Sequence, residues 1–349
     1  MGRAKDIGMN YSFDNITIHQ GCAWELASDL PAASINTIIT SPPYYAMRDY
    51  GVEGAFGLEK TIDEYVSKLV ELFRLLRPAL TDCGTVWLNL GDTYAGGGHS
   101  RNNRKNLSTS QHNTKASLGG VPAPRDLAPK QLLGIPWRVA LALQADGWYL
   151  RQDIIWHKLN AMPESVKDRC TKAHEYIFLL SKSPRYYFDR EAIKERAVGF
   201  DKAPPRGSIA AFGQPQQGRR KGNATTFRNG GKYTGGKHFD ADSYPQLTSG
   251  NKPNDTGLRS RRSVWATGVA NTSFAHFATF PKSLVRPAVL AGCPEGGIVL
   301  DPFFGSGTTG EVARELGRKC IGFELSQDYI DLAIKHRFSQ MMLAMEGVA

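Results

Sequence analysis

The sequence lacks the features that mark membrane, secreted and metal-binding proteins. It has no uncharged apolar stretch of the roughly 20 residues needed to cross a membrane, and residues 1–6 lack the apolar segment of a signal peptide. The five cysteines are scattered without a Cys-x-x-Cys pair, and the histidines show no metal-ligand spacing. We therefore expect a soluble, cytoplasmic protein with no membrane contact, no disulfide framework and no metal.

The chain has an excess of positive charge, and this excess is confined to one segment. The chain carries a net charge of +10, and residues 182–262 contain 17 Lys or Arg against 7 Asp or Glu, so the remainder is neutral. Within this segment, residues 199–257 are rich in Gly, Pro, Gln and Asn and have too few periodic apolar residues to build a core. Such a segment is expected where one module contacts phosphates. The alternative is a disordered basic insert with no ligand.

Along the rest of the chain, short β-branched and apolar runs alternate with segments of helical period. Strands are predicted at 16–19, 35–40, 84–92, 149–158, 174–181, 298–301 and 320–324. Helices are predicted at 23–30, 63–80, 135–146, 283–291, 311–316 and 328–345. About seven strands with helices between most of them predict an α/β sheet that is covered by helices on both faces.

The strand at 35–40 ends in the sequence Ser-Pro-Pro-Tyr, residues 41–44. Two consecutive prolines stop a strand because neither can donate a backbone hydrogen bond, so the strand opens into a rigid turn. The turn presents a hydroxyl, carbonyls of fixed direction and an aromatic face, which suit a planar ring that bears an amino group. Taken alone, this turn also fits an ordinary strand end.

A second turn, at 301–309, lies between a strand and a helix, and the next strand ends in Glu324. Gly305 and Gly307 let backbone amides approach a ligand closely, and Glu324 is placed to accept hydrogen bonds from ribose hydroxyls. The turn lacks the third spaced glycine of the dinucleotide fingerprint, and the chain has no Gly-Lys-Ser/Thr of a P-loop. A cofactor with a ribose, an adenine and an amino-acid tail but no phosphate fits better, namely S-adenosylmethionine.

Together, the turns at 41–44 and 301–309 resemble those of the DNA amino-methyltransferases, which methylate exocyclic nitrogens of cytosine or adenine. The order, with the Ser-Pro-Pro-Tyr turn first and the cofactor turn last, resembles the circularly permuted β group. Residues 156–158, 162–165 and 276–281 support the resemblance. It implies a Rossmann-like methyltransferase fold with a mixed seven-stranded sheet and a basic target-recognition insert.

This resemblance divides the chain into a catalytic half at 1–190 with a mobile loop at 95–131, an insert at 191–262 and a cofactor-binding half at 263–349. It implies catalytic roles for Ser41, Pro42, Pro43 and Tyr44. It implies cofactor contacts for Cys22, Phe280, Pro281, Asp301, Phe303, Gly305, Ser306, Gly307, Thr308 and Glu324. It implies DNA contacts for Arg101, Arg104, Lys105, Lys158, Arg169, Arg219, Arg220 and Lys221. The strand-end residues Asn89 and Asp92 are further candidates for the same cleft.

Cys22 departs from the family pattern, because relatives usually place an acid there to meet the cofactor adenine. A cysteine is a poor acceptor for an amino group. Either a backbone carbonyl or Glu25 substitutes for the acid, or the affinity for the cofactor is reduced.

The predicted chemistry follows from the weakness of an exocyclic amine as a nucleophile, since its lone pair is delocalised into the ring. In this hypothesis Ser41 Oγ and the Pro42 carbonyl draw on the amino protons, and Tyr44 stacks on the base. The base must first be flipped out of the duplex. No covalent intermediate is needed, which fits the absence of the Pro-Cys dipeptide used for methylation at ring carbon 5.

The resemblance implies that a serine rather than an aspartate at the head of the turn favours N4 of cytosine over N6 of adenine as the target. The expected partner is double-stranded DNA, with a homodimer left open, in a bacterial or phage-encoded restriction-modification protein that associates with the nucleoid while acting. Two further readings are an RNA methyltransferase and a catalytically silent DNA-binding protein, the latter supported only by Cys22.

Overall fold

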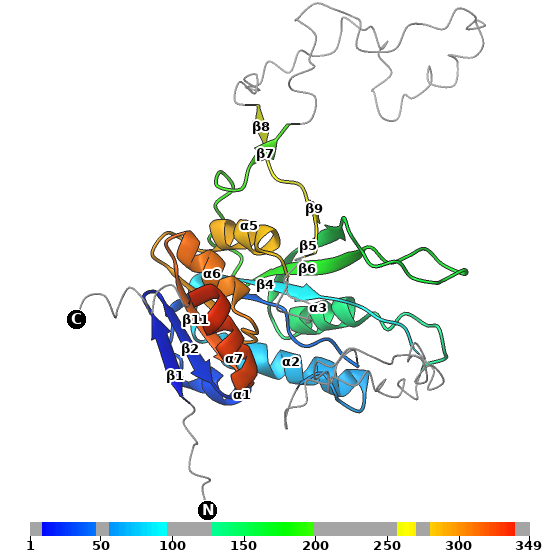
Figure 1. The fold of residues 1–349 in the computed structure, drawn as a ribbon, viewed down its shortest axis with the longest axis horizontal. Coiled ribbons are helices and arrows are strands. Elements are labelled where there is room, and N and C mark those ends of the chain that lie inside the picture. The colour runs from blue at the N-terminus through cyan, green and yellow to red at the C-terminus, as the bar shows by residue number, and fades with distance from the viewer. Residues whose placement is uncertain (1–8, 47–55, 96–126, 198–256, 270–279, 339–349) are drawn as a thin grey trace, which may run out of the picture. The chain divides into compact units, whose positions relative to one another are not determined.

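A computed structural model describes residues 9–46, 56–95, 127–197, 257–269 and 280–338 (Figure 1). The chain divides into two compact units, one formed by residues 1–193 with 262–349 and the other by residues 194–261. In the second unit the structure describes a short antiparallel hairpin of β7 (Glu195–Arg196) and β8 (Leu258–Arg259). Arg259 pairs with Glu195 across this hairpin, with 2.9 Å between Nε and Oε1.

The first unit is built around a mixed sheet of nine described strands in the order β1-β2-β11-β10-β3-β4-β6-β5-β9 (Figure 1). The strands are β1 (Asn10–Phe13), β2 (Ile16–Gln20), β3 (Ile35–Thr40), β4 (Leu80–Leu90), β5 (Tyr149–Lys158), β6 (His174–Ser181), β9 (Val264–Thr267), β10 (Ile298–Asp301) and β11 (Lys319–Glu324). Among these described strands, only β1 and β6 run antiparallel to their neighbours. The predicted α/β sheet is confirmed as mixed and largely parallel.

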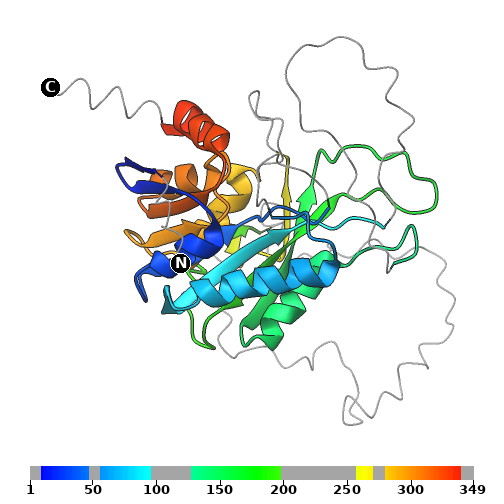
Figure 2. The ribbon, with the colours of Figure 1, turned by 90° about the horizontal axis from the view of Figure 1, so that it is seen from below.

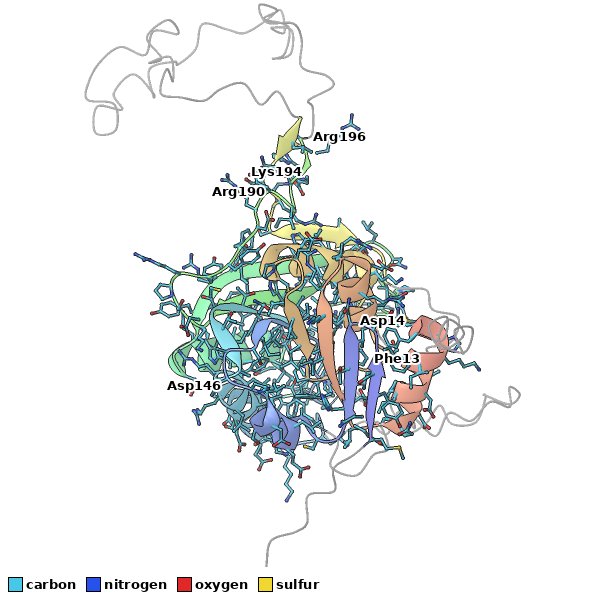
Figure 3. All side chains as sticks on the ribbon, turned by 90° about the vertical axis from the view of Figure 1, so that its left-hand side faces the viewer. Phe13, Asp14, Asp146, Arg190, Lys194 and Arg196 are labelled. Atoms are coloured by element: carbon cyan, nitrogen blue, oxygen red, sulfur yellow. The ribbon has the colours of Figure 1, made fainter. Side chains whose placement is uncertain are left out.

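The predicted number of seven strands is wrong for this sheet, because β1 and β9 extend it at its two edges. Neither is a continuous buried apolar run, unlike β10, which is equally short and was predicted. Strand β1 pairs with β2 in a hairpin, and β9 pairs with β5, which is distant in the chain. Figure 3 shows Phe13 and Asp14 at the end of β1, where the Phe13 ring stacks on Phe338 with 5.7 Å between ring centroids. Tertiary packing therefore stabilises β1, although its own sequence does not predict a strand.

Helices cover both faces of the sheet (Figures 1 and 2). They are α1 (Ala23–Leu26) with a short 3-10 turn (Ala27–Asp29), α2 (Ile62–Leu76), α3 (Ile135–Ala145), α5 (Lys282–Gly292), α6 (Thr308–Glu315) and α7 (Gln327–Ala333), which continues as a π-helical turn (Ile334–Phe338). Helices α1 to α3 share one core with Ile38 and Leu88, whereas α5 to α7 share another with Ile39 and Trp87. Neighbouring strand residues thus point to opposite cores, as the two-residue period of a strand requires.

Helix α2 shows how local chemistry sets the element boundaries. Its N-cap is Thr61, whose side chain accepts a hydrogen bond from the Glu64 N–H at 3.1 Å. The helix ends at Leu76 rather than at residue 80, because Pro78 lies two residues further on and has no N–H group to continue the helical hydrogen bonds. The chain then enters β4 at Leu80, four residues earlier than predicted.

Because of the strand directions, several polar residues come together at the carboxyl ends of the parallel strands. Strands β3, β4, β5, β10 and β11 are mutually parallel, so their carboxyl ends lie on the same side of the sheet, which we call the active edge. The last residues of four of these strands therefore lie there, namely Thr40, Lys158, Asp301 and Glu324. Strand β6 runs the opposite way and therefore begins at the same edge, where Glu175 is its second residue. Ligands bind at the carboxyl ends of strands in sheets of this kind.

Candidate active site

The side chains of Ser41 and Tyr44 meet at the end of β3. The Ser41 hydroxyl donates to the Tyr44 oxygen at 3.3 Å, and the Tyr44 hydroxyl donates to Glu175 Oε2 at 2.7 Å. Asn89 Oδ1 lies 3.1 Å from the same Tyr44 oxygen, so it shares the proton with the carboxylate. We call these side chains, together with Lys158, the acceptor cluster.

Glu175 is the charged centre of the acceptor cluster. Lys158 Nζ forms an ion pair with Glu175 Oε1, and Asn89 Nδ2 donates to Oε2 at 3.3 Å. The Lys158 ammonium also lies 4.6 Å from the centroid of the Trp156 ring, a distance at which a cation–π interaction forms. Lys158 is thus engaged with a carboxylate in this structure, and its predicted contact with DNA stays a prediction.

Burial and charge act together on the Tyr44 phenol. Burial of the hydroxyl raises the pKa of Tyr44 well above its usual value, and the neighbouring Glu175 carboxylate raises it further. The phenol therefore stays protonated at neutral pH and can donate its hydrogen bond to Glu175.

The backbone around the turn holds the Tyr44 ring in place. The Tyr65 hydroxyl donates to the Pro43 carbonyl at 3.0 Å, which ties the turn to α2. A side chain at Gly91 would put its Cβ 2.5 Å from Tyr44 Cε2, so the ring occupies the space that a glycine leaves open. The predicted rigidity of the turn thus comes from tertiary contacts as well as from its prolines.

Asp301 braces the cofactor turn against the end of β3. Its carboxylate accepts hydrogen bonds from the hydroxyls of Thr40 at 2.7 Å and Thr309 at 2.6 Å, and from the Phe303 N–H at 3.1 Å. Burial raises the pKa of Asp301 to about 7, and these three donors only partly offset that effect. Because Thr40 precedes Ser41 directly, Asp301 links the cofactor turn to the acceptor cluster.

The second acid, Glu324, closes the cofactor turn. Its Oε2 accepts from the Gly305 N–H at 2.7 Å and its Oε1 accepts from the Ser326 N–H at 2.9 Å. Burial raises the pKa of Glu324, an effect that these two backbone donors oppose. A carboxylate offers about four acceptor positions, and the backbone N–H groups of Gly305, Ser326 and Leu325 use three of them, so one is left for a donor such as a ribose hydroxyl.

The remaining residues of the cofactor turn are placed by glycine and by buried contacts. Gly307 has a φ of +82° and precedes α6, of which Thr308 is the first residue. The buried Ser306 hydroxyl has no hydrogen-bond partner within the described residues. An unpartnered buried hydroxyl, an acid with spare lone pairs and no phosphate-binding loop are features that fit a nucleoside cofactor without a phosphate.

Four further candidate cofactor contacts, Cys22, Phe280, Pro281 and Phe303, are also described by the structure. The Cys22 carbonyl accepts the N–H groups that begin α1, and Gly21, its neighbour, donates to the Glu324 carbonyl at 2.9 Å. The Phe303 ring lies 6.0 Å from the Trp24 ring, centroid to centroid and edge on. Pro281 is the N-cap of α5 and directly follows Phe280.

Several predicted DNA contacts fall outside the described residues. These are Arg101, Arg104, Lys105, Arg219, Arg220 and Lys221, and residues 276–279 also lie there. Arg169 is described: its guanidinium bonds Glu164 Oε2 at 2.6 Å and lies 4.0 Å from the centroid of the Tyr94 ring. Its predicted DNA role stays a prediction.

The strand-end residues Asn89 and Asp92 have different places. Asn89 belongs to the acceptor cluster, as described above. The Asp92 carboxylate instead accepts the Gly134 N–H at 3.1 Å and the Ile135 N–H at 3.2 Å, so it caps the start of α3. Asp92 therefore has a structural role in this fold.

Glu175 was missed by sequence reasoning. Glu175 could have been found only if the antiparallel direction of β6 had been known, because that direction brings the start of the strand to the active edge.

Within the described residues, no group of three or more His, Cys, Asp or Glu side chains could hold a metal ion. No helix in the same ranges is long and apolar enough to cross a membrane.

Comparisons with known proteins converge. A family model described as DNA methylase matches residues 35–335. The type II methyltransferase M.SmaI of Serratia marcescens is 41% identical over 313 residues, which cover 90% of this chain and 87% of M.SmaI. M.Cfr9I of Citrobacter freundii is 39% identical over 319 residues, which cover 91% of this chain and 86% of M.Cfr9I.

Solved structures share the fold at lower identity. The cytosine-N4-specific PvuII DNA methyltransferase aligns over 97% of this chain and 96% of its own, with a TM-score of 0.59 and 17% identity. A putative DNA modification methylase of Thermus thermophilus, solved with S-adenosyl-L-methionine, covers 93% of both chains with a TM-score of 0.51 and 20% identity.

Proposed function

The chain belongs to the DNA methylase family that these comparisons identify, and we propose that it is a site-specific methyltransferase for N4 of cytosine in double-stranded DNA. As a member of that family, it is an enzyme that methylates an exocyclic amine in DNA, with S-adenosylmethionine as the methyl donor. The choice of cytosine over adenine is the part that the proposal adds.

The observation that carries the proposal is the neutral hydroxyl of Ser41 at the active edge. It lies at the head of the turn that follows β3, and Asp301 connects this strand end to the cofactor turn through Thr40. Serine at this position is the form that the family resemblance associates with N4 of cytosine. A hydroxyl oxygen accepts a hydrogen bond from an amine without placing a charge beside the ring.

When bound, S-adenosylmethionine supplies a methyl group on a positively charged sulfur that a nucleophile can attack. Ser41 Oγ and the Pro42 carbonyl accept hydrogen bonds from the two amino protons of the base. With its protons held there, the amine nitrogen can become pyramidal and direct its lone pair at the methyl group. The rigid turn holds both acceptors in advance, which is the condition for electrostatic catalysis.

The cofactor is held by the second turn. Glu324 would accept a hydrogen bond from a ribose hydroxyl of the cofactor, and the turn residues Phe303 to Thr308 would hold the cofactor beside it. Tyr44 stacks on the flipped base, and the basic residues of the insert contact phosphates. Flipping costs a few kcal/mol, which these contacts compensate.

Mass analysis of digested nucleosides tests the proposal. Incubation of the protein with S-adenosylmethionine and duplex DNA of mixed sequence should give N4-methylcytosine. N6-methyladenine in its place would overturn the cytosine assignment while leaving the family assignment intact. Transfer to structured RNA in competition with duplex DNA would favour the RNA alternative. DNA binding with no methylated nucleoside from any substrate would favour the catalytically silent one.

A further inference from the structure

Methyl transfer to an amine leaves a proton to be removed, and Ser41 alone cannot hold it. The amine lone pair forms the new N–C bond, while the S–C bond breaks and its electron pair stays on sulfur. The nitrogen then carries the positive charge until one N–H bond gives up its proton. A serine hydroxyl is too weak a base to keep that proton, so a stronger acceptor must lie within reach.

The acceptor cluster contains such a group at the end of a short chain of hydrogen bonds. The Ser41 hydroxyl donates to the Tyr44 oxygen at 3.3 Å, and the Tyr44 hydroxyl donates to Glu175 Oε2 at 2.7 Å. All donors therefore point from the base toward the carboxylate. The first contact is longer than the usual 2.7–2.8 Å of an O–H···O hydrogen bond, and such contacts commonly tighten when the substrate binds.

We propose that Ser41, Tyr44 and Glu175 form a proton relay, with Glu175 as the group that takes up the proton lost by the methylated amine. Ser41 Oγ accepts the amine proton and passes its own proton to the Tyr44 oxygen. Tyr44 passes its proton to Glu175 Oε2. The positive charge that began on sulfur then cancels the negative charge of the carboxylate, so atoms and charge balance without any other reactant.

The relay also explains the orientation of Ser41. Because its hydroxyl proton is directed to Tyr44, the lone pairs of Oγ remain available for the amine of the base. Tyr44 thus has a role beyond stacking, and the role requires its hydroxyl.

The surroundings of Glu175 suit the end of a relay. Lys158 forms an ion pair with the carboxylate and so holds it at the end of the hydrogen-bond chain. Asn89 fixes Oε2 through its Nδ2 and is itself held by the Tyr176 carbonyl at 3.1 Å. The Glu175 side chain is 12% exposed and that of Lys158 is 21% exposed, so water can reach this end and remove the proton.

Two substitutions test the relay, which rests on the proposed function. Tyr44→Phe keeps the ring that stacks and removes only the hydroxyl, and Glu175→Gln keeps the shape and removes the charge. Each should lower the single-turnover rate of methyl transfer by about 100-fold, within the range of general acid–base effects. The dissociation constants for DNA and for S-adenosylmethionine should stay within about twofold of wild type, which a merely structural defect would not produce.

The double variant and a spectroscopic signal sharpen the test. If both residues act in one relay, Tyr44→Phe combined with Glu175→Gln should be no slower than the slower single variant. The ¹³Cζ resonance of Tyr44, assigned with Tyr44→Phe in the protein without cofactor, should shift in Glu175→Gln. The matched control is Asp82→Asn, which removes a carboxylate of 98% exposure at the opposite end of β4 and should change none of these values.

Several results would overturn the relay. One is a wild-type protein that methylates DNA while Tyr44→Phe and Glu175→Gln keep rates within twofold of wild type. Another is a double variant in which the two losses multiply, because the residues would then act separately. A wild-type protein that forms no methylated base on any DNA would overturn the proposed function, and the relay with it.

Discussion

The active edge has a cofactor end, formed by the turn at 301–309 and Glu324, and an acceptor end, formed by the acceptor cluster. A different kind of contact stabilises each of them. At the cofactor end, the acids Asp301 and Glu324 accept hydrogen bonds from the backbone N–H groups of Phe303, Gly305 and Ser326, which lie at most 19 residues from the acid in the chain. At the acceptor end, side chains from four strand ends bond one another across the sheet, with Tyr44 and Glu175 separated by 131 residues. The cofactor end is therefore a local construction, whereas the acceptor end exists only once the sheet has formed.

One buried carboxylate connects the two ends. Asp301 binds Thr309 on the cofactor side and Thr40 on the acceptor side. If this brace is what aligns the two ends, changes to Asp301 should affect the whole edge. Substitutions within the cofactor end or within the acceptor end should affect only that end.

The largest expected effect concerns the charge of this brace. Asp301 has a pKa of about 7 in the folded protein, raised by burial above its unfolded value of roughly 4, so its burial destabilises the fold increasingly as pH rises from 4 to 7. Asp301→Asn removes the charge and keeps the shape. Relative to wild type, its free energy of unfolding should therefore rise by on the order of 3 kcal/mol between pH 5 and pH 8.

Urea unfolding of both proteins at the two pH values measures this change. A stability difference that is the same at pH 5 and pH 8 would show that Asp301 titrates like an exposed acid. The brace would then not be a buried connection between the ends.

The next effect is confined to the cofactor end. A Cβ at Gly322 in β11 would lie 2.3 Å from Phe304 Cδ2, so Gly322→Ala should overpack the core beneath the cofactor turn and cost about 1–3 kcal/mol of stability. Gly268→Ala is the control, because its Cβ would have only an ordinary contact of 3.4 Å with Asn160. Thermal unfolding should show a clear loss for the first variant and little change for the second. Equal losses of stability in the two variants would contradict the claim that Gly322 is required by its close packing against Phe304.

The smallest effect concerns affinity. Glu324→Gln replaces one acceptor oxygen by an amide group that cannot accept from Gly305 or Ser326, so calorimetry should show binding of S-adenosylmethionine weakened about tenfold. Glu25→Gln changes an exposed acid in the first turn of α1, close to Cys22. It should leave the affinity within about twofold. A matching loss in Glu25→Gln would show that Glu25 replaces the acid that relatives carry at the Cys22 position.

The same contrast explains how far the sequence could be read. The turn at 301–309 and Glu324 were predictable because their chemistry lies within one strand, turn, helix and strand. The Ser-Pro-Pro-Tyr turn was predictable as a rigid strand end for the same reason. Glu175 was not, because its role depends on β6 running antiparallel to β4, and that direction is decided by pairing across the sheet. The edge strands β1 and β9 escaped prediction because neither is a continuous buried apolar run, whereas the equally short β10 is one.

The most direct test of this account measures chemistry and cofactor binding on one variant. Ser41→Ala removes the acceptor oxygen, and Ser34→Ala is its control, because the Ser34 hydroxyl bonds the Pro31 carbonyl at the other end of β3. Ser41→Ala should lower the single-turnover rate of methyl transfer by about 10²–10³-fold and leave the dissociation constant for S-adenosylmethionine within about twofold of wild type. A rate close to that of wild type, or an equal loss of cofactor binding, would contradict this prediction.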